Sequence, residues 1–256
     1  MLEHRSPREV FYRYLPYFTT SSFANPMLRY PTFVDQWPRR ERRLLTALIF
    51  FLLVGFAILS AIVLFLPTSM VDIRFTEGFQ ERRNPALDSL MKFVSWFGYG
   101  WQTAVMVFGT AGIWLLLGRR REAVFSVATA LCLPVVFAIK FAFGRTRPRV
   151  ELWDIVSNTP YQSFPSGHVA LYVTFFGFIF FLMYRLRHYP RWPRVVIASF
   201  CAFLIALVPV SRVYLGAHWF TDVLAGFAVG MLCLIGLCLW YLRAVHGDAP
   251  PEPVAN

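Results

Sequence analysis

Three short stretches of the sequence combine residue types that bind phosphate with residue types that attack or protonate it. The last of them contains Arg212, His218 and Asp222. Residues four apart share one face of a helix, so the Asp222 carboxylate can meet the His218 imidazole. A carboxylate bonded to one ring nitrogen leaves the other nitrogen free to attack, and an arginine offers planar donors that suit a phosphate. Taken alone, this stretch is also compatible with a basic-aromatic segment beside a membrane.

The first stretch runs from Lys140 to Pro148 and closes an apolar run. A charged side chain in a membrane span costs about 2.5–3.5 kcal/mol on insertion scales, so Lys140 either extends to the lipid headgroups or serves a site. Pro148 disfavours helix at the preceding residue, which places Arg147 in a loop. We interpret Arg145 and Arg149 as headgroup contacts, with contact to a second phosphate as the alternative.

The middle stretch, Pro165-Ser-Gly-His168, stands at the predicted start of a helix. We expect Ser166 to cap that helix and Gly167 to let the backbone approach a ligand closely, so that the free amides form an anion site. An ordinary helix cap would explain the serine and the glycine. It would not explain His168, whose imidazole can deliver a proton near neutral pH.

The composition predicts an all-α polytopic membrane protein. Apolar residues make up 57% of the 256 residues and charged residues 15%, against about 25% charged in soluble domains. The apolar residues form runs of spanning length. Six spans are predicted, over residues 44–66, 98–117, 123–143, 166–184, 195–210 and 220–242. Between the first two, residues 85–97 have a helical period that predicts an amphipathic helix along the outer interface.

The distribution of charge predicts how the chain is organised and oriented. Arginine clusters at 39–43, 119–121 and 185–194 alternate with loops in which acids offset bases, and the positive-inside rule then places both termini in the cytoplasm. The three motif stretches fall on the periplasmic or extracellular face of a cell (inner) membrane. We expect a cytoplasmic N-terminal arm over 1–43, a six-helix domain over 44–246 and a disordered tail over 247–256. The net charge of +11 is dispersed among short loops, which argues against nucleic acid as a partner.

Taken in order, the three stretches resemble the signature of the type 2 phosphatidic acid phosphatase (PAP2) family, in its membrane lipid phosphatase branch. The resemblance implies that His218 is the nucleophile and forms a phosphohistidine, that Asp222 orients it, and that His168 protonates the leaving oxygen. It implies a further set of groups that hold the phosphoryl oxygens, namely Lys140, Arg147, Ser166, Gly167 and Arg212.

The expected function is hydrolysis of a lipid phosphomonoester or terminal diphosphate at the outer leaflet. Polyprenyl diphosphate is the favoured substrate, because an outward site suits recycling of an envelope carrier lipid, and phosphatidate and phosphatidylglycerol phosphate are the others. No metal or cofactor is expected, since the cations are side chains and no carboxylate cluster suited to magnesium is present. The expected partners are the substrate and membrane lipids, and the oligomeric state is not indicated. The alternatives are a lipid phosphotransferase with the same site, a non-catalytic lipid or anion transporter, and a haloperoxidase, which the apolar spans disfavour.

Overall fold

The computed structural model of the protein describes residues 37–66, 68–148 and 162–247. The chain divides into two units, residues 1–43 and residues 44–256. The predicted tail lies outside the described residues except for Gly247, and so does most of the predicted arm. The described helices belong to the second unit, apart from the first residues of the helix that leads into it.

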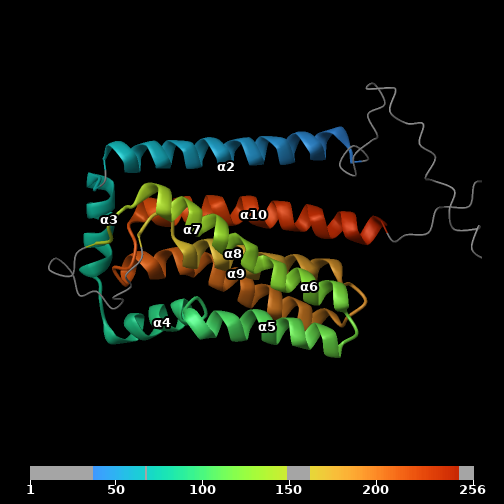
Figure 1. Cartoon of the computed structure of the whole chain (residues 1–256). Coiled ribbons are helices and arrows are strands. Elements are labelled where there is room, and N and C mark those ends of the chain that lie inside the picture. The colour runs from blue at the N-terminus through green and yellow to red at the C-terminus, as the bar shows by residue number, and fades with distance from the viewer. Residues whose placement is uncertain (1–36, 67, 149–161, 248–256) are drawn as a thin grey trace, which may run out of the picture. The chain divides into compact units, whose positions relative to one another are not determined.

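Every regular element in the described part of the chain is a helix (Figure 1). In chain order these are α2 (Arg39–Phe65), α3 (Met70–Gln80), α4 (Pro85–Trp96), α5 (Gly100–Leu116), α6 (Arg120–Ala128), the 3-10 turn η3 (Thr129–Leu131), α7 (Cys132–Phe143), α8 (Gly167–Arg185), α9 (Arg191–Tyr214) and α10 (Phe220–Gly247). Five helical stretches are long and apolar enough to cross a membrane, with α6, η3 and α7 counting as one, and α5 is a sixth, shorter apolar helix of 17 residues. The predicted all-α membrane class is confirmed.

Two short helices, rather than the one predicted, connect the first two spans. The predicted amphipathic helix is α4, which begins with Asn84 accepting a hydrogen bond from the Leu87 amide and with proline in its first turn. The helix that the prediction missed is α3, which begins at Ser69, whose hydroxyl oxygen accepts from the Asp72 amide. Its 11 residues are more polar than α4, so periodicity alone did not reveal it. Both helices lie at the same end of the helix bundle in Figure 1.

The core of the unit is built around α8, which packs extensively on α9 and α10. Glycines make the contact with α10 close. Gly226 and Gly230 are four residues apart on α10, and a Cβ on either would meet backbone oxygen of α8 or its cap: Ser166 O at 2.5 Å from position 226 and Ala170 O at 2.8 Å from position 230. Small residues at this spacing let two membrane helices approach each other closely. The start of α8, which carries the middle motif, is therefore seated directly against α10.

This contact predicts a stability effect that is specific to one glycine. Gly226→Ala should destabilise the protein by about 1–3 kcal/mol, because overpacking forces the backbone of α8 to move. Gly236→Ala is the matched control, since it adds the same methyl group to the same helix where nothing lies within 4 Å. Thermal unfolding in detergent should show a lower Tm for Gly226→Ala than for Gly236→Ala. Equal Tm values would contradict the close contact.

Candidate active site

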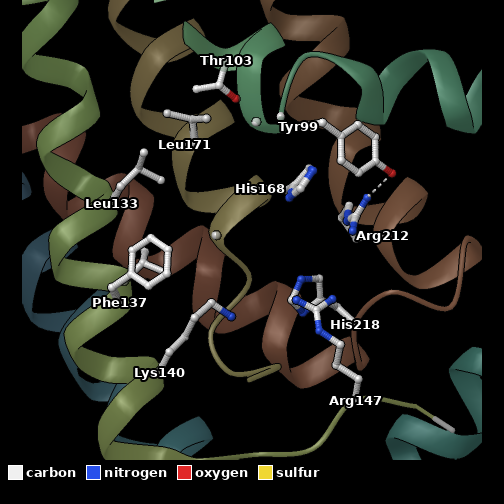
Figure 2. Close-up of a pocket in the computed structure, with 14 residues that line it drawn as sticks. Tyr99, Thr103, Leu133, Phe137, Lys140, Arg147, His168, Leu171, Arg212 and His218 are labelled. Atoms are coloured by element: carbon white, nitrogen blue, oxygen red, sulfur yellow. Dashed lines mark hydrogen bonds between the residues drawn. The ribbon is translucent and has the colours of Figure 1, made fainter. Parts of the chain in front are cut away.

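The three sequence stretches meet around one cavity of about 330 Å³ (Figure 2). Its polar wall comes from α7, the loop after it, the start of α8, the end of α9 and the turn before α10. Its apolar wall comes from α7 and α8, and the connection between α4 and α5 and the start of α5 complete the lining. The lining residues are Gly98, Tyr99, Gly100, Thr103, Leu133, Val136, Phe137, Lys140, Arg147, Gly167, His168, Leu171, Arg212 and His218. Residues that are far apart in the chain thus converge on one partly open cavity.

Lys140 is buried and points into this cavity rather than toward lipid (Figure 2). It lies in the last turn of α7, which ends at Gly144 in a left-handed conformation, with φ of 59°. A glycine adopts that conformation without steric cost. The Lys140 ammonium donates to the carbonyl oxygens of Gln162 at 2.5 Å and Ser163 at 3.2 Å. It therefore also ties the segment before α8 to α7.

Two arginines supply the other cations of the cavity. Arg147 lies in the loop after α7 and donates to the carbonyl oxygen of Ala217 at 2.7 Å, which holds it beside His218. Burial, followed by the charge of Arg212, lowers the pKa of Arg147 to about 10, so it stays charged at neutral pH. Arg212 is 1% exposed and donates to the hydroxyls of Ser95 at 3.1 Å and Tyr99 at 3.2 Å.

Three buried polar atoms at the site have no hydrogen-bond partner among the described residues. They are Ser166 Oγ, His168 Nε2 and Arg212 Nε. The expected side-chain cap by Ser166 is not formed, although Ser166 is the residue before the first turn of α8. Leaving a buried polar atom unpaired costs free energy, and an anion in the cavity would satisfy the guanidinium of Arg212, which lines it; Ser166 is not among the lining residues. The first amides of α8 offer further donors at the same place.

His218 and Asp222 lie close together, as their spacing suggested, but they do not share a helix face: His218 lies in the turn before α10, and Asp222 in its first turn. His218 Nδ1 lies 3.5 Å from Asp222 Oδ2, and the hydroxyl of Ser163 lies beside both, 3.4 Å from Nδ1 and hydrogen-bonded to the carboxylate. Burial, followed by the charges of Arg147, Arg212 and Lys140, lowers the pKa of His218 well below its ordinary value. The imidazole is therefore neutral at pH 7, and a neutral imidazole has the free electron pair that a nucleophile needs.

Arg145 does not contact lipid headgroups, contrary to the interpretation of the sequence. Its side chain is 2% exposed and forms ion pairs with Asp222 at 2.6 Å and with Asp72 at 2.7 Å. Its charge is engaged by these two carboxylates, which also argues against contact with a second phosphate. Arg149, the other flanking arginine, lies outside the described residues.

Sequence reasoning missed several residues that shape the site. Tyr99, in the connection between α4 and α5, has its ring 4.9 Å from that of His168 in an edge-on arrangement and also contacts Arg212. Gly98 lies directly against the His168 ring. Ser163 bonds the carboxylate of Asp222. None belongs to a recognisable motif, so spacing along the chain offered no signal for them.

The contact of Gly98 with His168 predicts a loss of activity on a small substitution. A Cβ at position 98 would overlap the His168 imidazole, so Gly98→Ala should displace the ring. Misplacement of a reacting group by about 1 Å can cost ~10²-fold, and we expect a roughly 10- to 100-fold lower kcat. Gly109→Ala, in α5, adds the same methyl group where nothing lies within 4 Å. If the two variants released phosphate at equal rates, the stated role of Gly98 would be wrong.

Within the described ranges, no group of three or more His, Cys, Asp or Glu residues is arranged to hold a metal ion. The four cysteines are free, and all lie in helices. The polar groups that line the cavity are imidazoles, cationic side chains, the Tyr99 phenol, the Thr103 hydroxyl and backbone amides.

Comparison with known proteins gives relatives of one kind. Residues 121–245 match the PAP2 superfamily. The putative undecaprenyl-diphosphatase YbjG of Escherichia coli (strain K12) is 31% identical over 132 residues, which are 50% of this chain and 62% of that protein. The lipid A 1-phosphatase of Rhizobium etli is 31% identical over 170 residues, 58% of this chain and 68% of that protein. Phosphatidylglycerophosphatase B of Bacillus subtilis is 39% identical over 86 residues, 34% of this chain and 42% of that protein.

Solved structures show the same fold. The crystal structure of a transmembrane PAP2 type phosphatidylglycerolphosphate phosphatase from Bacillus subtilis superposes with a TM-score of 0.64 at 21% identity, covering 80% of this chain and 98% of that chain. Aquifex aeolicus LpxE superposes with a TM-score of 0.54 at 20% identity, covering 68% and 98%. The matched region of the sequence contains all three motif stretches. With the fold and the sequence in agreement, the chain belongs to the PAP2 superfamily.

Proposed function

We propose that this protein is a membrane phosphatase that hydrolyses a lipid phosphate or diphosphate through a phosphohistidine. One observation carries the proposal: a single cavity is lined by three cations and two imidazoles on one side and by apolar side chains on the other. Lys140, Arg147 and Arg212 match the charge of a phosphate. The apolar residues from α7 and α8 suit the first carbons of a lipid chain. The hydrocarbon tail of the lipid substrate would pass between these helices into the bilayer.

The first chemical step forms a bond between His218 Nε2 and phosphorus. The electron pair of Nε2 attacks, the bond from phosphorus to the lipid oxygen breaks, and His168 gives its proton to that oxygen. Nδ1 faces Asp222 and Ser163, which leaves Nε2 as the nitrogen that attacks. The ring becomes positively charged, and the Asp222 carboxylate stabilises that charge. The three cations and the Gly167 amide stabilise the charge on the phosphoryl oxygens in the transition state.

The second step returns the enzyme to its starting state. A water molecule gives a proton to His168 and attacks phosphorus, the nitrogen–phosphorus bond breaks, and its electron pair returns to Nε2. Inorganic phosphate leaves. All groups in both steps are side chains and amides of this chain, so we propose that the reaction needs no metal ion.

Polyprenyl diphosphate is the substrate that we favour. Support comes from the similarity to a protein named putative undecaprenyl-diphosphatase. The relatives named lipid A 1-phosphatase and phosphatidylglycerophosphatase B make lipid A and phosphatidylglycerol phosphate the other substrates to compare. The phosphatase domain is proposed to comprise residues 44–246, with residues 1–43 as a cytoplasmic arm.

We place the cavity on the periplasmic or extracellular side of the cell membrane, with both termini in the cytoplasm. The arginines at 185, 187, 191 and 194 lie at the end of α8 and the start of α9, and the cavity lies at the opposite ends of these two helices. This arrangement satisfies the positive-inside rule. A membrane-impermeant maleimide added to intact cells should label Ser89→Cys, in the exposed part of α4, and not Arg187→Cys. The reverse labelling would overturn the orientation.

The function is tested by phosphate release from purified protein. The panel contains undecaprenyl diphosphate, phosphatidylglycerol phosphate, phosphatidate and lipid A, each with and without EDTA. We expect release in the presence of EDTA, fastest from the diphosphate. Loss of release on chelation would contradict the metal-free mechanism. If no phosphate were released but lipid moved across the membrane of liposomes that contain the protein, a transporter would be favoured. If phosphate were transferred to an added lipid alcohol and not released, a phosphotransferase would be favoured.

A further inference from the structure

A carboxylate from a distant part of the chain is buried against the start of α10. Asp72, on α3, is 0% exposed. Its Oδ1 accepts hydrogen bonds from the amide of Thr221 at 2.9 Å and from the hydroxyl of Thr221 at 3.0 Å, across 149 residues of sequence. Asp72 therefore satisfies a free amide in the first turn of the helix that carries Asp222.

The other oxygen of Asp72 belongs to a buried ionic cluster that reaches Asp222. Arg145 donates from Nη2 to Asp72 Oδ2 at 2.7 Å, and from Nη1 to Asp222 Oδ1 at 2.6 Å and to the Thr221 hydroxyl at 2.7 Å. One guanidinium thus links two carboxylates, all at most 2% exposed. Burying such a cluster is costly, and ion pairs of this kind are weak evidence for stability. A role in holding a neighbouring group in place is the better explanation.

The contacts of Asp222 are divided between its two oxygens. Oδ1 accepts from Arg145, whereas Oδ2 accepts from the amide of Trp219 at 3.0 Å and from the hydroxyl of Ser163, and it faces His218 Nδ1 at 3.5 Å. Rotation of the carboxylate would break both sets of bonds together. Arg145, together with Trp219 and Ser163, therefore sets the orientation of Asp222, and Asp72 and Thr221 hold the guanidinium of Arg145.

We propose that Asp72 is a positioning residue for the nucleophile: through Arg145 and Thr221 it holds Asp222 in the orientation that directs His218 toward the phosphate. The proposal rests on the proposed function, in which His218 attacks phosphorus. Asp72 also balances the charge of Arg145. With Asp72 neutral, Arg145 would place an additional uncompensated cation beside Asp222 and weaken the stabilisation of the positive ring that forms on attack.

Asp72→Asn tests this role, because it removes the charge and retains an oxygen for the Thr221 amide. We expect a roughly 10- to 100-fold lower kcat, with a KM within about twofold of the wild type, because the three cations of the cavity are unchanged. Asp88→Asn is the matched control. Asp88 is on the neighbouring interfacial helix α4 and pairs with Arg83 at 2.9 Å, outside the cavity. Its kcat should stay within about twofold of the wild type.

Asp72→Glu tests whether the negative charge at position 72 holds Arg145 and Asp222 in place or whether the side chain only supports the fold. The glutamate keeps the charge, and kcat should recover to within about fivefold of the wild type. A folded Asp72→Asn with unchanged kcat, or with a raised KM and unchanged kcat, would overturn the proposal. So would equal losses of kcat in the asparagine and glutamate variants.

Thr221→Val provides a second test in case Asp72→Asn does not fold. It removes the hydroxyl that links Asp72 to Arg145 without altering any charge, and we expect kcat to fall roughly 3- to 10-fold at constant KM. Unchanged kcat would overturn the proposal. Rapid acid quench with a ³²P-labelled substrate distinguishes the two proposals. If the wild type forms no labelled protein, the proposed function fails; if it does, and Asp72→Asn forms it at the same rate, only the role of Asp72 fails.

Discussion

Phosphate release should fall by at least about 10⁴-fold when His218 is replaced by alanine. The reason is that the proposed mechanism makes His218 the nucleophile and gives His168, the other imidazole of the cavity, the role of proton donor. The cavity would still bind the substrate, because its cations Lys140, Arg147 and Arg212 remain. Release of phosphate from undecaprenyl diphosphate measures the loss, and acid quench with a ³²P-labelled substrate should show no labelled protein.

His188→Ala is the control for this experiment. His188 lies in the connection between α8 and α9, is exposed, and contacts Arg119 at 2.6 Å, at the end of α8 opposite the cavity. Loss of its imidazole should change the rate by less than about twofold. If His218→Ala retained a tenth of the wild-type rate, another group would have to be the nucleophile and the mechanism would be wrong.

Replacing His168 by asparagine should slow the hydrolysis of a lipid phosphate by about 10²–10⁴-fold, the usual contribution of a general acid. The leaving group decides how large the loss is. A lipid alkoxide needs a proton as it departs, whereas p-nitrophenolate, the anion of a much stronger acid, leaves without one. The variant should therefore lose far less activity toward p-nitrophenyl phosphate, and the ratio of kcat/KM for the two substrates measures the effect.

Two further variants locate the cause of that loss. Gly98→Ala displaces the His168 ring without removing it, so it should show a weaker form of the same dependence on the leaving group. Arg147→Gln removes a cation that binds phosphate and should slow both substrates similarly. An equal loss toward both substrates in His168→Asn would show that the imidazole binds phosphate and does not donate the proton.

The helices were largely predictable because hydropathy and helical period are local properties. All the predicted spans except the first start within four residues of the observed helices. The exception is α2, which starts at Arg39, five residues before the first predicted span. A helix can extend beyond the lipid through polar residues, so hydropathy does not mark its first turn. The helix α3 escaped prediction because its 11 residues are more polar than those of α4, so no apolar period marks it.

The candidate site was predictable in part. The residues of the three stretches could be named because phosphate binding and nucleophilic attack require particular residue types, and the spacing of His218 and Asp222 is that of one helical turn. Arg145 was misinterpreted because an arginine at a membrane boundary ordinarily meets headgroups. Its burial between two carboxylates depends on where α3 packs, and nothing near Arg145 in the chain indicates that.

By itself, the sequence determined that this chain is a helical membrane protein and which residues form the three stretches that resemble the PAP2 signature. Both follow from composition and from spacings within a few residues. Only the tertiary structure decided that Arg145 supports Asp222, that Ser163 lies beside His218, and that Gly98 and Tyr99 enclose His168. Those contacts join segments separated by up to 77 residues, and they arise from helix packing, which depends on the shapes of all the helices together.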